Sequence, residues 1–313
     1  MPGKQSPLVS IVVITYNSAK YVLETLESAR AQTYKYIELV ISDDCSLDDT
    51  VSLCEEWLKN NRERFVTAKI VKTKKNSGIA INCNNGVRNA NGEWIKLVAG
   101  DDLVTESCIS DNIDFVGLNT NCSVIASNRY LYYEKEQKKV KDHCKYIKLF
   151  SNPNITAKDQ YQLALRRISL PFNTFFIKKN VFEIIHYLDE RFPMLEDWPL
   201  RLRVLRNDIK IFYLNKFTAI YRVHGGSITK SLKLRYSSWF MNTYKNVRCE
   251  YFLPNVTFIE RLMFRYEFIV HSFIYNTSLN KTNRFSSGIN YLLLSPVRIV
   301  RTVIKKCLIS KFE

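Results

Sequence analysis

The strongest constraint on the fold is a regular alternation of two residue patterns over the first hundred residues. Short apolar, β-branched runs with the length of a buried strand alternate with longer segments whose apolar residues recur at helical spacing. The predicted strands are Val9–Thr15, Ile37–Ser42, Phe65–Lys72 and Trp94–Val98, and the predicted helices cover 18–31, 46–58 and 79–89. Strands that alternate with helices in this way predict a mostly parallel sheet with helices on both faces.

The pattern is less regular after residue 105. We expect helices at Ile109–Leu118, from 178 through Tyr187, at Glu196–Asn207, at 256–275 and at 297–309. Further strands are expected in Ser123–Tyr133, Ile209–Leu214 and Ala219–Val223. Leu170–Ile177 is an apolar segment, and the charged segment Glu134–Tyr146 is expected to be an exposed loop.

Positive charge is concentrated near the C-terminus. The chain carries 46 Lys and Arg against 30 Asp and Glu, a net charge of +16. Residues 226–313 hold 7 Lys and 7 Arg against 4 Glu, so +10 of that charge lies there. This shift predicts a boundary between a domain at 1–225 and a basic, mostly helical region at 226–313. A surplus of this size also calls for an anionic partner or surface.

Cysteine spacing and hydropathy indicate where the protein is located. None of the eight cysteines forms a C-x-x-C pair, and a chain of 313 residues does not need disulfides to build a core. We therefore expect reduced thiols and a cytoplasmic protein. No apolar run approaches about 18 residues, the length that a spanning helix needs, and Leu8–Thr15 is too short for a signal peptide.

Polar residues follow the predicted strands at one edge of the sheet. Tyr16-Asn17 follow the first strand, Asp43/Asp44 the second and Asp101/Asp102 the fourth. A single Asp pair is equally well explained as a turn or helix cap, but two pairs at one edge favour a ligand site. Adjacent carboxylates can hold Mg²⁺ or Mn²⁺. No glycine-rich phosphate loop is present, so a nucleotide bound here would depend on the metal.

Five segments in a fixed order carry a resemblance to a known family. They are Val9-Ser10-Ile11-Val12-Val13-Ile14-Thr15-Tyr16-Asn17, Val40-Ile41-Ser42-Asp43-Asp44-Cys45-Ser46, Gly92-Glu93-Trp94-Ile95-Lys96 with Gly100-Asp101-Asp102, Leu195-Glu196-Asp197-Trp198-Pro199-Leu200-Arg201, and Tyr221-Arg222-Val223-His224-Gly225-Gly226-Ser227. Over residues 7–229 the chain resembles the family 2 glycosyltransferases. The resemblance implies a GT-A fold, an α/β architecture whose mostly parallel, Rossmann-like sheet is flanked by helices, with a nucleotide-binding half at 1–104 and an acceptor-binding half at 105–225.

The resemblance also implies roles for individual residues. Tyr16 would stack on the base of the donor nucleotide, and Asp44 would accept a hydrogen bond from uracil. Asp197 would be the general base with Glu196 beside it, although an acidic pair at a helix N-terminus is also explained by the helix dipole. The expected donor-binding residues are Thr15, Tyr16, Asn17, Asp43, Asp44 and Asn84, and the expected ligands of Mn²⁺ or Mg²⁺ are Asp101, Asp102 and His224. His224 has the alternative of being an ordinary loop histidine.

Two positions depart from the family pattern. Ala99 stands where the family often has the first acid of a D-x-D motif, so metal binding would rest on Asp101, Asp102 and water. Cys83-Asn84 stand where the family often has Arg-Asn, so a contact to the donor phosphate is missing or comes from Lys96 or Arg88.

The C-terminal region carries a basic amphipathic pattern. Within 297–309, Val297, Val300, Ile304 and Leu308 recur at helical spacing among Arg and Lys residues. This pattern is typical of a helix on a membrane surface, and its alternative is a packed helix with a solvated basic face. Because such transferases use lipid-linked acceptors, the resemblance favours an anionic membrane partner and a peripheral position on its inner face.

The function predicted from these features is inverting, metal-dependent transfer of a sugar from a nucleotide-sugar, with UDP as the expected nucleotide. The acceptor would be a glycan or a polyprenyl-linked saccharide in surface-polysaccharide synthesis. A nucleotidyltransferase has a similar sheet but a glycine-rich N-terminal loop, where this chain has Ile14-Thr15-Tyr16-Asn17. Nucleic-acid binding would suit a pI of about 9.4, but no nucleic-acid motif is present, so we expect no nucleic-acid partner.

Overall fold

A computed structural model of the chain describes residues 6–143, 145–192, 195–225 and 236–312. The chain forms two compact units. Unit 1 comprises the residues up to 161 together with 169–223, and unit 2 comprises 162–168 together with 224 onward. Gly226 and Ser227 of the fifth segment lie outside the described residues.

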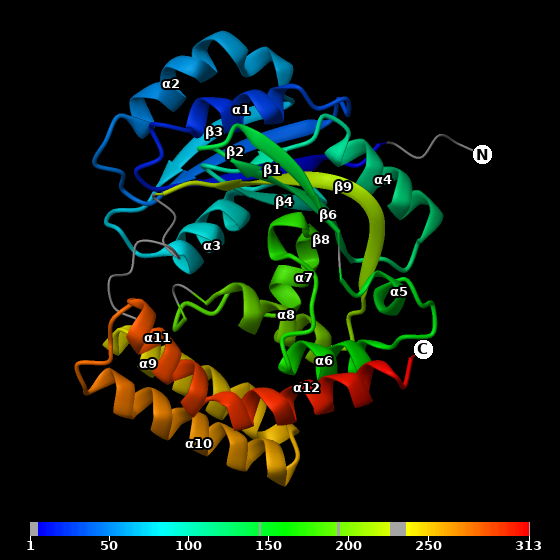
Figure 1. The fold of residues 1–313 in the computed structure, drawn as a ribbon. Helices are drawn as coiled ribbons and strands as arrows, with labels where there is room; N and C mark the ends of the chain where they lie inside the picture. The colour runs from blue at the N-terminus through cyan, green and yellow to red at the C-terminus, as the bar shows by residue number, and fades with distance from the viewer. Residues whose placement is uncertain (1–5, 144, 193–194, 226–235, 313) are drawn as a thin grey trace. The chain divides into compact units, whose positions relative to one another are not determined.

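The sheet of unit 1 has nine strands (Figure 1). Its order is β3-β2-β1-β4-β8-β6-β9-β5, with β7 paired to β6. The strands are β1 (Val9–Thr15), β2 (Ile37–Asp43), β3 (Thr67–Lys72), β4 (Trp94–Ala99), β5 (Leu103–Val104), β6 (Val124–Tyr133), β7 (Lys138–Asp142), β8 (Phe176–Lys178) and β9 (Ile211–Val223). β1 to β4 are mutually parallel, as predicted, and β8 joins β4 in the antiparallel sense.

Both faces of the central parallel strands β1 and β2 are buried. Ile11 and Val13 of β1 belong to a core cluster with Leu26 of α1 (Val22–Arg30) and Trp57 of α2 (Thr50–Asn61). Side chains alternate along a strand, so Val12 faces the other way, toward α3 (Ile79–Asn89). A methyl group at Gly86 of α3 would lie 2.5 Å from Val12 Cγ1, which explains why glycine is needed there. Figure 1 shows α1 and α2 on one face of the sheet and α3 on the other.

The described part of the chain contains further helices in both units. The list is η1 (Arg62–Arg64), α4 (Cys108–Leu118), α5 (Ile147–Phe150), α6 (Ala157–Leu165), η2 (Phe172–Thr174), α7 (Lys179–Ile184), α8 (Asp197–Arg206), α9 (Ser238–Val247), the π-helix η3 (Arg248–Phe252), η4 (Leu253–Asn255), α10 (Phe258–Tyr275), α11 (Arg284–Leu293) and α12 (Ser295–Ile309). Within the described residues, none of the helices combines the length and apolar content that a bilayer crossing requires.

Unit 2 has its own small core. Val270 and Ile274 of α10 pack with Tyr236, Met241 and Leu294, all buried. Thr257 and Glu260 form a reciprocal capping box at the start of α10, which fixes where this helix begins.

Three predicted elements are wrong in detail. Helix α1 begins at Val22 rather than Ser18, because 18–21 form a turn in which Ser18 O accepts from the backbone N–H of Val22. The segment predicted as a loop at Glu134–Tyr146 contains strand β7, whose exposed, Lys-rich residues give no apolar alternation. The two strands predicted at 209–223 are one strand, β9, which continues through a bulge against β6.

The seven cysteines that the structure describes are free thiols, and Cys144 lies outside the described residues.

Candidate active site

The ends of β1 and β2 are joined by polar contacts. Thr15 pairs with Asp43 in the sheet register, and the Thr15 hydroxyl donates to the Asp43 carboxylate at 2.8 Å. The second Asp43 oxygen accepts the backbone N–H of Ser46 at 2.8 Å. Asp43 is 1% exposed, so its carboxylate shapes the turn after β2 from inside the protein.

Asp44 organises the loop that leads into α3. Its carboxylate accepts the Thr73 hydroxyl at 2.8 Å, the Ser77 N–H at 2.9 Å and the Gly78 N–H at 2.7 Å. Gly78 has φ 92°, a left-handed conformation that favours glycine, and α3 starts at the next residue. Asp44, which is predicted to accept a hydrogen bond from uracil, therefore also holds this loop in place.

Tyr16 and Asn17 follow β1 at the same edge. The Tyr16 side chain is 42% exposed, as a ring that stacks on a base must be. Asn17 adopts φ 48°, and its side-chain oxygen accepts the Leu47 N–H at 2.8 Å while its own N–H donates to the Ser46 hydroxyl at 2.9 Å. These contacts tie the loop after β1 to the loop after β2.

The acidic turn, residues 99–102, directly follows β4 and closely approaches the end of β1. The Gly100 N–H donates to Ile14 O at 2.8 Å, and a methyl group at Gly100 would lie 2.9 Å from Ser18 Oγ. The strand ends that sequence reasoning predicted to converge are thus brought together. Burial, and then the neighbouring Asp101 charge, raise the pKa of Asp102 to about 7.

Arg222 of β9 holds the acidic turn through both its backbone and its side chain. Its backbone N–H donates to Asp102 Oδ1 at 2.9 Å, and its guanidinium Nε donates to the Asp101 carbonyl at 2.9 Å. The same guanidinium pairs with Glu24 of α1 at 2.7 Å and stacks over the Tyr21 ring. Arg222 is 3% exposed, so this is a buried, multiply bonded cation.

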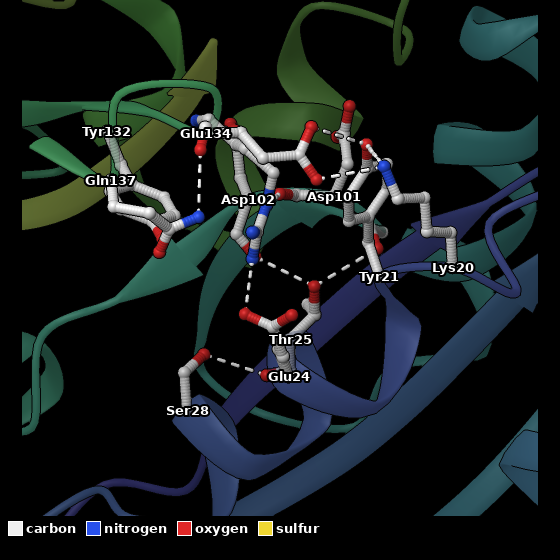
Figure 2. Close-up of polar contacts among 12 residues, drawn as sticks. Lys20, Tyr21, Glu24, Thr25, Ser28, Asp101, Asp102, Tyr132, Glu134 and Gln137 are labelled. Carbon is white, nitrogen blue, oxygen red and sulfur yellow. Dashed lines mark hydrogen bonds and ion pairs between the residues drawn. The ribbon is translucent and has the colours of Figure 1, made fainter. Parts of the chain in front are cut away.

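Helix α1 completes the support of the turn (Figure 2). The Thr25 hydroxyl lies between the Gly100 carbonyl at 3.0 Å and the Asp102 carbonyl at 2.8 Å. Lys20 pairs with Glu134 at 2.9 Å, and the Tyr21 hydroxyl donates to the same carboxylate at 3.0 Å. Sequence reasoning missed Glu24 and Thr25 altogether and gave Arg222 no role, although Arg222 stands in the fifth resembling segment.

The acidic turn offers oxygen ligands that suit a divalent cation. Among the described residues, no group of three or more His, Cys, Asp or Glu side chains is placed to hold a metal. Mg²⁺ and Mn²⁺, however, need only one or two carboxylates when water and substrate phosphates supply the rest. Burial, and then the Asp101 charge, raise the pKa of Asp102, so a cation at the turn would favour the charged form of this carboxylate. The residues present therefore fit such an ion.

The remaining predicted ligand and the acidic pair lie on different segments. Half-buried His224 directly follows β9, two residues after Arg222. Asp197 is the first residue of α8, and its side chain is 40% exposed with Arg201 at 3.4 Å. Glu196 Oε2 is buried and has no hydrogen-bond partner among the residues that the structure describes. Burial, and then the Asp197 charge, raise the pKa of Glu196 to about 7.

Residues of α3 interact with groups near the acidic pair Glu196-Asp197 and with Asp44, which belongs to the edge formed by the ends of β1, β2 and β4. This edge is called the nucleotide edge below, after its predicted role. Burial raises the pKa of the Cys83 thiol, and the charges of Glu196 and Asp44 raise it further, so this residue lies within electrostatic reach of both. The neighbouring Asn84 donates to Leu188 O at 3.0 Å and to Glu190 Oε1 at 2.9 Å, while its oxygen accepts the Leu188 N–H. Asn84 is 1% exposed and holds the segment that precedes α8.

Lys96 and Arg88, the two residues predicted as alternative contacts to the donor phosphate, both contact other groups of the protein. Lys96 is fully buried, and its ammonium donates to Asn173 O at 2.7 Å. Arg88 lies over the Tyr187 ring and 3.7 Å from Glu190. Lys96 therefore joins β4 to the segment before β8 rather than reaching the edge of the sheet.

The structure is thus an α/β fold with carboxylates at the carboxyl ends of its parallel strands. The sequence model of "Glycosyl transferase family 2" matches residues 10–184, which is more than half of the chain. The chain belongs to glycosyltransferase family 2.

Similar proteins support this assignment. The chain is 30% identical over 224 residues to the UDP-Glc:alpha-D-GlcNAc-diphosphoundecaprenol beta-1,3-glucosyltransferase WfaP of Escherichia coli, covering 71% of this chain and 80% of that protein. It is 28% identical over 233 residues to the glycosyltransferase GlyG of Streptococcus pneumoniae, covering 72% and 74%.

Solved structures share the fold. TarS of S. aureus, residues 1–349 in complex with UDP-GlcNAc, has a TM-score of 0.62 at 19% identity, covering 92% of this chain and 79% of that chain. The mannosyltransferase PcManGT of Pyrobaculum calidifontis, in complex with GDP-Man and Mn²⁺, has a TM-score of 0.59 at 14% identity, covering 98% and 86%. The GT-A fold predicted from the sequence is confirmed.

The support of the acidic turn predicts a specific effect of Arg222→Met. The substitution keeps an unbranched side chain but removes the donor to Asp101 O and the partner of Glu24, so the free energy of unfolding should fall by about 1–3 kcal/mol. Turnover should fall by about 10²-fold because the turn is no longer held in place. Denaturant unfolding and a donor-turnover assay measure the two effects. The control is Lys216→Met on the same strand, which removes a surface pair and should change neither; equal effects in both variants would refute the supporting role.

The raised pKa of Glu196 predicts a pH effect on stability. An acid whose folded-state pKa lies above its ordinary value stabilises the fold at low pH, and this contribution is lost as pH rises toward about 7. Glu196→Gln keeps the neutral form, so its free energy of unfolding should gain on that of the wild type between about pH 5 and pH 8. Urea unfolding at several pH values measures the difference. The exposed Glu136→Gln should show no such trend, and a constant difference for Glu196→Gln would contradict the prediction.

Proposed function

We propose that this enzyme is an inverting, metal-dependent glycosyltransferase that moves a sugar from a UDP-linked donor to a hydroxyl of a glycan or polyprenyl-linked acceptor. The observation that carries the proposal is the accessible carboxylate of Asp197 at the first residue of α8, directly after the buried Glu196. A single base and a leaving nucleotide diphosphate suffice for inversion.

The donor half of the proposal rests on the strand ends. Tyr16 would stack on the base, and Thr15, Asn17, Asp43 and Asp44 would shape the pocket for uridine. Asn84 would act indirectly, through the segment that it holds. UDP is favoured because WfaP is named for a UDP-Glc donor and TarS is solved with UDP-GlcNAc.

The metal half of the proposal rests on the acidic turn. Asp101 would be the main protein ligand of Mn²⁺ or Mg²⁺, since Asp102 already accepts the Arg222 N–H. His224 is the further candidate ligand. When bound, the cation would offset the charge of the leaving diphosphate.

The mechanism assigns the proton transfer to Asp197. Its carboxylate takes the proton of the acceptor hydroxyl while that oxygen attacks the anomeric carbon. The bond from this carbon to the donor phosphate oxygen breaks, and its electron pair leaves with UDP. Glu196, neutral below about pH 7, avoids a second negative charge beside the base. Membership of the family favours this reaction over nucleotidyl transfer and over nucleic-acid binding.

Asp197→Asn tests the base. The substitution keeps size and removes the basic carboxylate, so turnover should fall by about 10²–10⁴-fold while affinity for UDP changes little. The matched variant is Glu196→Gln, which should lose much less because it reproduces the neutral form. Initial rates with a UDP-sugar and UDP titrations give the two readouts. A larger loss in Glu196→Gln would move the base to that residue, and equal small losses would refute the mechanism.

We also propose that unit 2 binds an anionic membrane surface. Helices α10 to α12 expose large apolar side chains, namely Phe258, Ile259, Leu262, Tyr266, Ile269, Phe273, Phe285, Tyr291, Leu292, Ile299 and Val303. Exposed cations, including Arg261, Arg265 and Arg298, lie between them in the sequence. Apolar and basic side chains that share exposed helix faces suit the boundary of a bilayer. WfaP is named for an acceptor with a diphosphoundecaprenol group, which resides in such a bilayer.

Point substitutions test the membrane surface better than deletion of the C-terminus, because Leu294 and Val297 are buried and their loss would disturb the fold of unit 2. The double variant Ile269→Ser, Leu292→Ser should bind anionic vesicles less tightly, by roughly 2–4 kcal/mol if both side chains enter the bilayer. Leu118→Ser, an 86% exposed apolar residue of unit 1, is the control. Vesicle co-sedimentation measures the change, and equal binding by all three proteins would refute the surface.

A further inference from the structure

A partly open cavity within unit 2 is lined by an excess of cationic side chains. Its volume is about 70 Å³, room for several water molecules. Five cations and two carboxylates line it, leaving a surplus of three positive charges. The charged lining residues are Arg166, Arg167, Arg248, Arg301, Lys305, Glu260 and Glu267.

Both carboxylates of the cavity are engaged by arginines. Glu260 accepts two hydrogen bonds from Arg166, at 2.7 Å and 2.8 Å. Glu267 accepts two from Arg301, at 3.1 Å and 3.0 Å, and one from the Tyr244 hydroxyl at 2.9 Å. The positive surplus therefore remains after these internal pairs are counted.

The guanidinium of Arg248 is held rigidly at the cavity. It lies 4.3 Å from the centre of the Phe252 ring and 5.2 Å from that of Tyr244, and the residue is 4% exposed. Arg248 and Phe252 are the first and last residues of the π-helix η3, an irregularity that is frequent at functional sites. Burial lowers the pKa of Arg248, which shows that the cation stands in a poorly solvated place.

Two further cations reach the cavity from other elements. Arg167 follows α6 in a left-handed conformation, φ 59°, which is uncommon for a residue with a side chain. Lys305 comes from α12, and burial, followed by the Arg301 and Arg167 charges, lowers its pKa. Cations from three separate segments therefore meet around one space: Arg166 and Arg167 directly after α6, Arg248 in η3, and Arg301 and Lys305 in α12.

We propose that this cavity is a binding site for a phosphate or diphosphate group. Guanidinium groups match the oxygens of phosphate with paired hydrogen bonds, and a dianion would offset most of the positive surplus. The group could belong to a lipid headgroup or to a free phosphate. The proposal concerns unit 2 alone and does not depend on the reaction proposed for unit 1.

Binding of inorganic pyrophosphate in the presence of EDTA tests the site, because the chelator removes the metal on which binding at the acidic turn would depend. The full-length protein should be stabilised by pyrophosphate in a thermal-shift titration. Lys305→Gln should weaken this binding about tenfold or more. Arg167→Gly should do the same while keeping a residue that accepts positive φ. Lys306→Gln, the exposed neighbour on α12, should bind as the wild type does.

A second arm distinguishes the source of the phosphate. Vesicles of phosphatidylcholine with phosphatidic acid are compared with vesicles of phosphatidylcholine with phosphatidylglycerol. If the wild type binds the phosphatidic acid vesicles more tightly and Lys305→Gln abolishes this difference, the site binds a lipid headgroup. If Lys305→Gln weakens the binding of pyrophosphate but not of either vesicle, the site binds a free phosphate. The proposal is overturned if neither probe binds the wild type, or if Lys305→Gln and Lys306→Gln respond alike while both remain folded by circular dichroism.

Discussion

The geometry of the candidate active site depends on the hydrogen bonds that Arg222 donates to the acidic turn. One buried guanidinium joins the Asp101 carbonyl, the Glu24 carboxylate and the Tyr21 ring, and the backbone of the same residue holds Asp102. A buried arginine is costly unless its donors are satisfied, so the strand, the turn and helix α1 must keep their relative positions. Two carboxylates can then remain close together despite their mutual repulsion.

The parallel sheet determines where the other groups lie. Because β1, β2 and β4 run in the same direction, their carboxyl ends meet, and Tyr16, Asp44 and Asp101 reach the same edge. Helix α3 also contacts a later part of the chain, since Asn84 forms hydrogen bonds with Leu188 and Glu190.

The sequence predicted what depends on local patterns, and it missed what depends on distant partners. The four parallel strands and their polar ends followed from β-branched runs and turn residues. The ion pair of Arg222 with Glu24 joins residues that are 198 positions apart, and no local sequence pattern predicts it. The roles of Asp44 and Asn84 as anchors were hidden for the same reason, because both are defined by loops that only the folded chain brings near. Strand β7 was missed because an exposed, charged edge strand lacks apolar alternation.

The central claim is that the acidic turn binds a divalent cation together with a nucleotide diphosphate, and calorimetric titration of UDP tests it most directly. The wild type should bind UDP more tightly with Mn²⁺ than with EDTA, and Asp101→Ala should lose that metal-dependent gain while keeping the metal-independent affinity of the nucleotide edge. Equal gains with Mn²⁺ in the wild type and in Asp101→Ala, or no UDP binding by the wild type, would contradict the account.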